Sequence, residues 1–380
     1  MRTEGRQLDT TIMDLSFVLV RHNPNVQLEF YSCSPNLTGS LQLQYQASHP
    51  ALTPSIYRCP NLAFDYNHAE LLISAWKKVG NIPSSSTLAL HRLSSYFALG
   101  ATEPGFEAYP KNLGSSSILY YQNQTYVSRT TVDRQEAPSG VSLFIRPSSQ
   151  NAKWTQLPLK ATRSAKAISS QLLTRSATKG SFQYVHHICQ TEKGTLFIDS
   201  VKDTLFMDFS PDNSIFWQSV EVPNSASLGI CEGNFSSCLL FDQSNGQSKW
   251  KLYIFYVTKD SPGSTESKIK AFYIPLRQDG SLDKNKADFQ GWQVIDSYNL
   301  ASSSTQPGPI TARLDEGGKA VWLVYTVGGG QPRCVTASFG ENGELPKSGT
   351  QWSQREMELG FVPSEKDQYT SIFLPRAYIE

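Results

Sequence analysis

Two adjacent histidines, His186 and His187, are the side chains in this sequence best suited to move a proton near neutral pH. They follow Tyr184 in a Tyr-Val-His-His segment that predicts a strand. Neighbouring side chains on a strand point to opposite faces, so only one of the two histidines can face a central channel. We expect this strand to be the innermost of its sheet. His186 and His187 are therefore candidate catalytic acids and Tyr184 a candidate substrate-binding residue, with ordinary core or surface histidines as the alternative.

Arg313 is the third candidate catalytic residue, because a guanidinium can donate two parallel hydrogen bonds to a pair of adjacent ligand oxygens. The alternative is an ordinary surface ion pair. Tyr96 lies on the strand that we expect to correspond in another repeat, and is a candidate substrate-binding residue. Trp76 is a further candidate, either as a lid over a pocket or as simple packing.

Motifs of the common enzyme classes are missing from the sequence. It contains no GxSxG, no HExxH and no GxxxxGK[ST], and the glycines 328–330 are typical of a turn. Its cysteines and histidines lack the spacing of a zinc site. We therefore expect neither a cofactor nor a bound metal.

Charge and composition limit the partners. Lys and Arg number 34 against 33 Asp and Glu, a net charge of +1, whereas nucleic-acid binders usually carry a clear basic excess. The longest apolar runs, 252–257 and 321–327, are far shorter than the roughly 20 residues of a membrane helix. We expect small apolar molecules as substrates, no nucleic-acid or membrane partner, and a monomer or homodimer.

Strand patterns dominate the chain. Alternating, β-branched and aromatic residues bounded by Gly, Pro, Asn and Ser occur at 26–31, 40–45, 117–121, 141–145 and 250–256. Only 67–78 and 165–175 could hold a helix, and the first also fits a buried strand.

A four-strand unit recurs along the chain. Each copy ends near a tryptophan, and Trp154, Trp217, Trp292 and Trp352 follow one another at intervals of 63, 75 and 60 residues. Repeats of this size with Asn-Gly or Asp-Gly turns are typical of propeller blades. The sequence thus predicts an all-β, single-domain β-propeller of five or six four-stranded blades, with the tryptophans packed between blades. A two-sheet sandwich is the alternative.

One domain is expected to span 1–380. We expect 1–11 to be disordered and 62–86 to be either an irregular insert or part of an extra blade. The strand-like tail 369–374 is expected to close the ring by pairing with N-terminal strands.

Cysteines and glycosylation sequons bear on the compartment. Cys231 and Cys238 flank a short segment that a disulfide could close, and Asn36, Asn123 and Asn234 begin Asn-X-Ser/Thr sequons. The first residues do not have the pattern of a secretory signal. We expect a glycoprotein of the secretory pathway or the extracellular space, its signal peptide absent from this chain. The alternative is a cytoplasmic protein with buried thiols.

Several blade motifs carry a family resemblance over roughly residues 90–358. They are Ile118-Leu-Tyr-Tyr-Gln122, Leu252-Tyr-Ile-Phe-Tyr256 with Gly291-Trp292, and Trp322-Leu-Val-Tyr325 with Gln351-Trp352. In these motifs the chain resembles fungal fucose-specific lectin-like propellers. Such lectins repeat an Arg, a Glu and an aromatic residue between blades to grip the sugar. We do not find that set at equivalent positions of the repeats.

A degenerate propeller of this kind also resembles the fungal hetero-Diels-Alderases of tropolonic sesquiterpenoid biosynthesis. The resemblance implies a cofactor-independent enzyme that joins a tropolone quinone methide to a humulene-type sesquiterpene by a stereoselective cycloaddition. Holding two reactants in place, excluding water and polarising one carbonyl would suffice. The alternatives are a fucose-binding lectin, an interaction scaffold, and a glycosidase, which would use carboxylates such as Asp199, Asp208 and Asp242.

Overall fold

The computed structural model describes the strands of the chain and part of its connections. The described residues are 18–22, 27–32, 40–48, 61–65, 70–78, 86–93, 116–121, 124–132, 138–147, 153–157, 167–173, 184–191, 194–202, 217–222, 225–242, 249–259, 261, 263–277, 282, 293–300, 307–315, 317–327, 332–346, 351–359 and 368–372. The segment 1–11, which we predict to be disordered, lies outside them.

The described strands form six sheets, numbered here I to VI in chain order. Sheet I contains β1 (Val18–His22), β2 (Gln27–Ser32), β3 (Ser40–Ser48), β23 (Glu358–Leu359) and β24 (Gln368–Ile372). Sheet II contains β4 (Asn61–Asp65), β5 (Glu70–Lys78) and β6 (Ser86–Leu93). Sheet III contains β7 (Ser116–Tyr121), β8 (Gln124–Val132), β9 (Pro138–Pro147) and β10 (Thr155–Leu157).

The other three sheets each have four antiparallel strands. Sheet IV contains β11 (Ala167–Leu173), β12 (Tyr184–Thr191), β13 (Leu196–Lys202) and β14 (Trp217–Glu221). Sheet V contains β15 (Cys231–Asp242), β16 (Lys249–Lys259), β17 (Glu266–Leu276) and β18 (Gln293–Asn299). Sheet VI contains β19 (Ile310–Leu314), β20 (Ala320–Thr326), β21 (Pro332–Ser338) and β22 (Ser353–Glu356).

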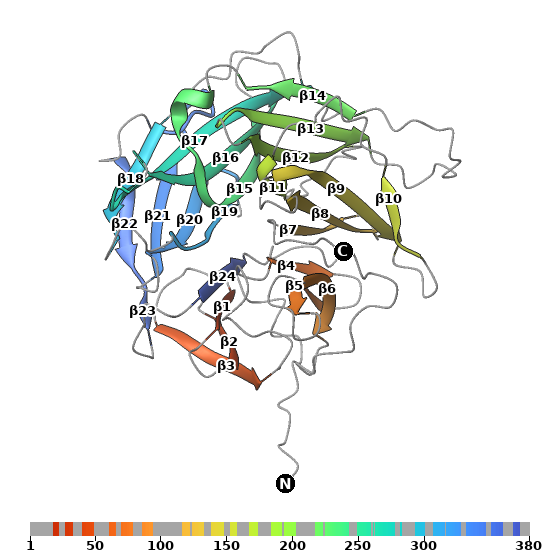
Figure 1. Ribbon diagram of the computed structural model, residues 1–380. Helices are drawn as coiled ribbons and strands as arrows, with labels where there is room; N and C mark the ends of the chain where they lie inside the picture. Colours follow the sequence, from red (N-terminus) through yellow and green to blue (C-terminus); the bar gives the residue numbers. More distant parts are fainter. Residues whose placement is uncertain are drawn as a thin grey trace.

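The sheets surround a common centre, which makes the fold an all-β propeller (Figure 1). The strands β4, β7, β11, β15 and β19 each begin a sheet, and contacts run from each to the next. Strand β24 contacts both β19 and β4. The described residues include a 3-10 turn at Ser225–Leu228, and none of their helices has the length and apolarity to cross a membrane.

Segments from near the C-terminus flank both edges of sheet I. Strand β24 pairs antiparallel with β1, from Val18 opposite Ile372 to His22 opposite Gln368, as the tail was predicted to do. On the opposite edge, β23 pairs in parallel with β3. The sheet order is therefore β23, β3, β2, β1, β24.

Alternation along the strands of sheet V creates two buried cores. On β16, Tyr253, Phe255 and Val257 face sheet VI, while the intervening Leu252, Ile254 and Tyr256 face sheet IV. We call the first core the V/VI seam and the second the IV/V seam. Because both faces of sheet V are buried, β16 reads as a nearly continuous apolar run. Trp352 is buried in the V/VI seam, in agreement with the predicted packing of tryptophans between blades.

The helix alternatives for 67–78 and 165–175 are wrong. The first segment contains β5, the central strand of sheet II, and the second contains β11, the first strand of sheet IV. Both segments are short, and their apolar residues fit the helical period as well as the strand period. Hydrogen bonding to neighbouring strands makes them strands. Strands β4 to β6 thus extend across the segment 62–86.

The predicted boundaries of the four-strand units agree with the observed sheets V and VI. In sheet IV the predicted unit begins one strand too late. There the Tyr184 strand is β12, the second of its sheet, because β11 precedes it. In sheet III the predicted unit begins too early and misses β8. Strand β11 lies in the segment 165–175, whose sequence also fits a helix, so it was not counted as a strand of the repeat.

The predicted disulfide between Cys231 and Cys238 is wrong. Both residues lie on the single strand β15, where seven residues span roughly 20 Å, far more than the Cα separation of a disulfide. Cys231 also belongs to the IV/V seam and Cys238 to the V/VI seam. Burial raises the pKa of the Cys238 thiol, which keeps it protonated.

Substitution of Gly229, just before β15, is expected to destabilise the protein more than substitution of Gly263, a glycine with a similar backbone conformation. Gly229 and Gly263 have φ of 91° and 85°, where any other residue costs about 1 kcal/mol or more. A Cβ on Gly229 would also lie 2.1 Å from Thr258 Oγ1, whereas one on Gly263 would have nothing within 4 Å. We expect Gly229→Ala to lower the free energy of unfolding by about 1–3 kcal/mol more than Gly263→Ala. Urea denaturation measures the difference, and equal losses would contradict it.

Candidate functional site

The candidate catalytic residues lie on different sheets. His186 is buried on β12 of sheet IV, next to His187 and two residues after Tyr184. Arg313 is half-buried on β19, the first strand of sheet VI. The expectation that the histidines lie on an innermost strand is wrong, because β12 is second in its sheet. Sheet V separates His186 from Arg313, so the structure does not bring them together (Figure 1).

The other predicted residues are scattered. Trp76 lies on β5 and is paired with Leu88 of β6. Of the glycosidase candidates, Asp199 is on β13 and Asp242 ends β15, in different sheets. Asn234 lies on β15 at a shift in strand register. Tyr96, Asp208, Asn36 and Asn123 lie outside the described residues.

A buried cluster in sheet I has the residue types of a sugar site. Arg21 on β1 and Glu29 on β2 are direct cross-strand partners. Arg21 Nε donates to Glu29 Oε2 at 2.6 Å, and Arg21 NH2 lies 2.5 Å from the same oxygen. The Tyr31 hydroxyl also donates to Oε2, at 2.9 Å, and the Arg21 guanidinium carbon lies 5.8 Å from the centre of the Tyr31 ring.

These three residues are almost completely buried. Arg21, Glu29 and Tyr31 are 8%, 5% and 4% exposed, so a full positive and a full negative charge are held away from water. Such a pair is tolerated only with good geometry and further hydrogen bonds, which the Tyr31 hydroxyl helps to supply. The result is a rigid group of donors and acceptors beside an aromatic ring.

Sequence reasoning missed this cluster because it looked for a repeated set. A signal was present: Arg21 ends the apolar run Val18-Leu-Val20 and Glu29 lies between Leu28 and Phe30, on either side of one short connection. Charged residues at inward positions of neighbouring strands indicate a buried pair.

Among the described strands, sheet I alone has an arginine–glutamate pair at this register position. Arg21 and Glu29 are one pair before the end of the hairpin that joins the second and third strands of sheet I, counting β24 as the first. Other residue pairs occupy the corresponding register position of the other sheets. Among the described strands these are Lys77 with Thr87, Thr131 with Gly140, Cys189 with Phe197, Thr258 with Lys268, and Tyr325 with Arg333.

A second polar cluster lies in the V/VI seam. The Tyr325 hydroxyl on β20 donates to Asp296 Oδ2 on β18, which also accepts from Gln354 Nε2 at 3.1 Å. The Tyr298 ring stacks on the Tyr325 ring, with centroids 5.6 Å apart and planes 14° apart. Burial raises the pKa of both phenols, and the hydrogen bond to Asp296 raises that of Tyr325 further. Both tyrosines therefore stay protonated as neutral hydrogen-bonding groups.

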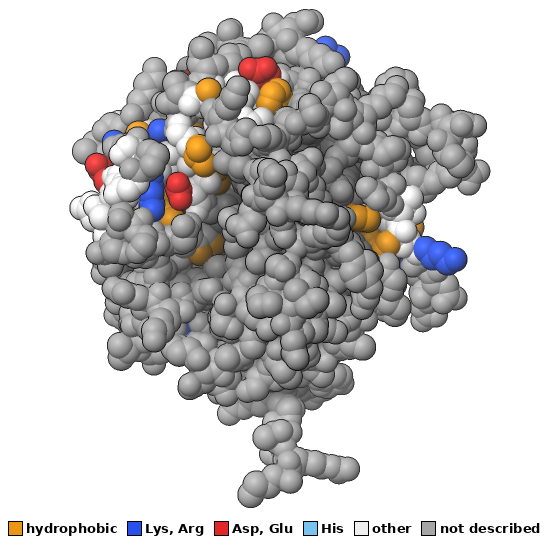
Figure 2. Space-filling view, viewed as in Figure 1, with side chains coloured by type: hydrophobic (Ala, Val, Ile, Leu, Met, Phe, Trp, Pro, Cys, Tyr) orange, Lys and Arg blue, Asp and Glu red, His pale blue; other side chains and the backbone are white. Residues whose placement is uncertain are grey.

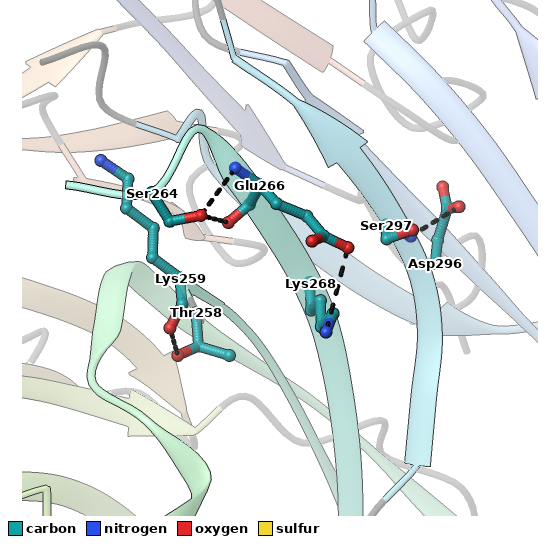
Figure 3. Close-up of polar contacts among 7 residues, drawn as sticks. All are labelled: Thr258, Lys259, Ser264, Glu266, Lys268, Asp296 and Ser297. Carbon is teal, nitrogen blue, oxygen red and sulfur yellow. Dashed lines mark hydrogen bonds and ion pairs between the residues drawn. The ribbon is translucent and has the colours of Figure 1, made fainter. Parts of the chain in front are cut away.

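Charged side chains of β17 lie near Asp296 in sheet V. Figure 3 shows the Lys268–Glu266 pair, 3.9 Å apart on β17, beside Asp296 on β18, whose Oδ1 accepts from the Ser297 amide at 2.8 Å. On the face seen in Figure 2, described charges of both signs are interspersed in this part of the molecule. Within the described ranges, no group of three or more His, Cys, Asp or Glu is placed to hold a metal.

Alkaline pH is expected to destabilise the fold through the seam tyrosines. The pKa of an unfolded tyrosine is about 10, and burial raises the pKa of Tyr253, Tyr298 and Tyr325 above that. Unfolding then releases protons, so stability is unaffected below about pH 10 and falls as pH rises beyond it, by up to about 1.4 kcal/mol per pH unit for each tyrosine. Urea titrations from pH 8 to 11 test this, and a Tyr298→Phe chain should lose less. A flat profile above pH 10 would contradict it.

The sequence matches no family model and is similar to no curated protein. Several solved structures are similar in overall fold. AofleA from Arthrobotrys oligospora has 9% identity and a TM-score of 0.46, covering 96% of this chain and 91% of that chain. The fucose-recognising lectin of Aleuria aurantia, a six-bladed β-propeller, has 10% identity and a TM-score of 0.44, covering 92% and 98%. The periplasmic gluconolactonase PpgL of Pseudomonas aeruginosa has 10% identity and a TM-score of 0.43, covering 94% and 99%.

Proposed function

We propose that this β-propeller binds a carbohydrate of the fucose type at one site, built on Arg21, Glu29 and Tyr31. The observation that carries the proposal is the buried contact of these three side chains, an arginine, a glutamate and an aromatic residue. These are the residue types that fucose-specific propellers use to hold their sugar.

The chemistry of the cluster suits a neutral polyol. A guanidinium donates to sugar oxygens, a carboxylate accepts from sugar hydroxyls, and an aromatic ring packs against the C–H groups of a pyranose. The mutual contacts of Arg21 and Glu29 fix both groups before the ligand arrives, so little side-chain entropy is lost on binding.

Calorimetric titration with L-fucose, after a glycan array, tests the proposal. Arg21→Lys keeps the charge but loses the planar fork, and Glu29→Gln keeps the shape but loses the charge. Each is expected to weaken fucose binding about tenfold or more. Arg313→Lys, the same change on β19, is the matched control and should bind normally. Normal fucose affinity in a folded Arg21→Lys chain would overturn the proposal.

A hetero-Diels-Alder cycloaddition is the second candidate function. It is favoured by the corresponding register positions of the other described sheets, which hold no Arg–Glu pair, since a multivalent lectin would keep its site in several sheets. In this reaction a tropolone quinone methide adds to an alkene of a humulene-type terpene. One C–O and one C–C bond form, with no further reactant.

Incubation with humulene and a hydroxymethyl tropolone precursor tests this candidate, with product stereochemistry followed by chiral chromatography. The expected result is an accelerated, single-enantiomer adduct. Racemic product at the uncatalysed rate would exclude the enzyme.

A further inference from the structure

Two buried polar groups in the V/VI seam have no hydrogen-bond partner among the residues that the structure describes. They are the Tyr298 hydroxyl and Trp352 Nε1, whose residues are 5% and 7% exposed. An unsatisfied buried donor costs about 1–3 kcal/mol, so two in one core call for an explanation. A bound polar molecule is the explanation that the surrounding residues support.

The donors, acceptors and charges near Tyr298 indicate the chemical class of such a molecule. Its phenol interacts electrostatically with Asp296 and Arg333, and its ring lies against that of Tyr325. Arg333 favours acceptor oxygens, and the phenol and indole supply donors, whereas the Asp296 carboxylate accepts from hydroxyls. An anion would be repelled by Asp296 and a cation by Arg333. A neutral molecule with several hydroxyls satisfies both.

The polar cluster of the seam reaches the protein surface at Gln354. Gln354 is exposed and Asp296 is half-buried, and they are joined by the 3.1 Å hydrogen bond that lies over the Tyr325 hydroxyl. Figure 3 shows Asp296 on β18 beside Glu266 and Lys268 of β17.

We propose that the V/VI seam binds a neutral polyhydroxylated small molecule, with Tyr298, Asp296, Gln354 and Trp352 as its contacts. The site is on the opposite side of sheet VI from sheet I, and it uses none of the residues of the Arg21 cluster. It does not depend on the function proposed above.

Calorimetric titration with myo-inositol, compared with cyclohexanol, is the test. The two probes share a six-membered ring but carry six hydroxyls and one. We expect one molecule of myo-inositol per chain and no binding of cyclohexanol. Tyr298→Phe removes only the phenol oxygen and should weaken myo-inositol binding about tenfold. Gln354→Met, at an exposed position that does not threaten folding, should weaken it by a smaller factor.

Tyr256→Phe is the matched control, because Tyr256 is a buried tyrosine of the same sheet that faces the IV/V seam. It should bind myo-inositol normally, and so should Glu29→Gln. Unchanged binding in folded Tyr298→Phe, equal loss in Tyr256→Phe, loss in Glu29→Gln, or no myo-inositol binding by the unmodified chain would each overturn the proposal. A crystal structure at saturating myo-inositol with only water at the Tyr298 hydroxyl would do the same.

Discussion

Glu29→Ala is expected to lower the free energy of unfolding by about 3–5 kcal/mol. The substitution leaves Arg21, a residue that is 8% exposed, without its carboxylate partner, and it removes the acceptor of the Tyr31 hydroxyl. An uncompensated buried charge, not the lost attraction, accounts for most of the cost. Chemical denaturation followed by tryptophan fluorescence measures the loss.

A double variant and a control variant separate the effect of the buried charge on stability from the role of the pair in fucose binding. Replacing the pair together, by Arg21→Met with Glu29→Leu, should restore most of the stability because no charge is left buried. That chain should still fail to bind fucose. Glu266→Ala is the control: its partner Lys268 is 3.9 Å away and Glu266 is well exposed, so the loss should stay below about 1 kcal/mol. A loss of under 1 kcal/mol for Glu29→Ala would contradict the buried pair.

A chain that ends at Leu359 is expected to lose its native fold. It lacks β24, which pairs with all five residues of β1 and contacts β4 and β19 in the neighbouring sheets. Without β24 the edge of β1 is open, and the contact between sheet VI and sheet I through that strand is gone. We expect loss of the cooperative thermal transition and a shift to aggregates in size-exclusion chromatography.

Addition in trans gives the matching control. A synthetic peptide covering 360–380 should restore part of the transition in the shortened chain, whereas a scrambled peptide of the same composition should not. A sharp transition in the shortened chain without peptide would show that β24 is dispensable.

The sequence predicts the fold well where both faces of a sheet are buried. In β16 and β20 the runs Leu252-Tyr-Ile-Phe-Tyr256 and Ala320-Val-Trp-Leu-Val-Tyr-Thr326 contain enough apolar and aromatic residues to mark strands without any partner. Prediction fails at β11, where Ala-Ile-Ser-Ser-Gln-Leu-Leu fits a helix as well as a strand. Pairing with β12 decides it, and pairing is not local information.

The site was harder to predict than the fold. His186 was found as a chemical group, but its strand was placed one position too far inward. Arg21 and Glu29 were missed because their significance lies in facing each other across a hairpin, eight residues apart. The V/VI cluster combines residues from β18, β20 and β22, whose proximity depends on two sheets packing together.

Sheet I takes its central strands from the first fifty residues and both of its edges from the last twenty-five. During translation, β1 to β3 leave the ribosome first. They can pair with β23 and β24 only after nearly the whole chain has been synthesised. During that interval the Arg21–Glu29 pair is incompletely buried. The outer edges of β1 and β3 are unpaired and accessible to other nascent chains. Slow translation or a chaperone that covers β1 would therefore affect the yield of folded protein more than its final stability.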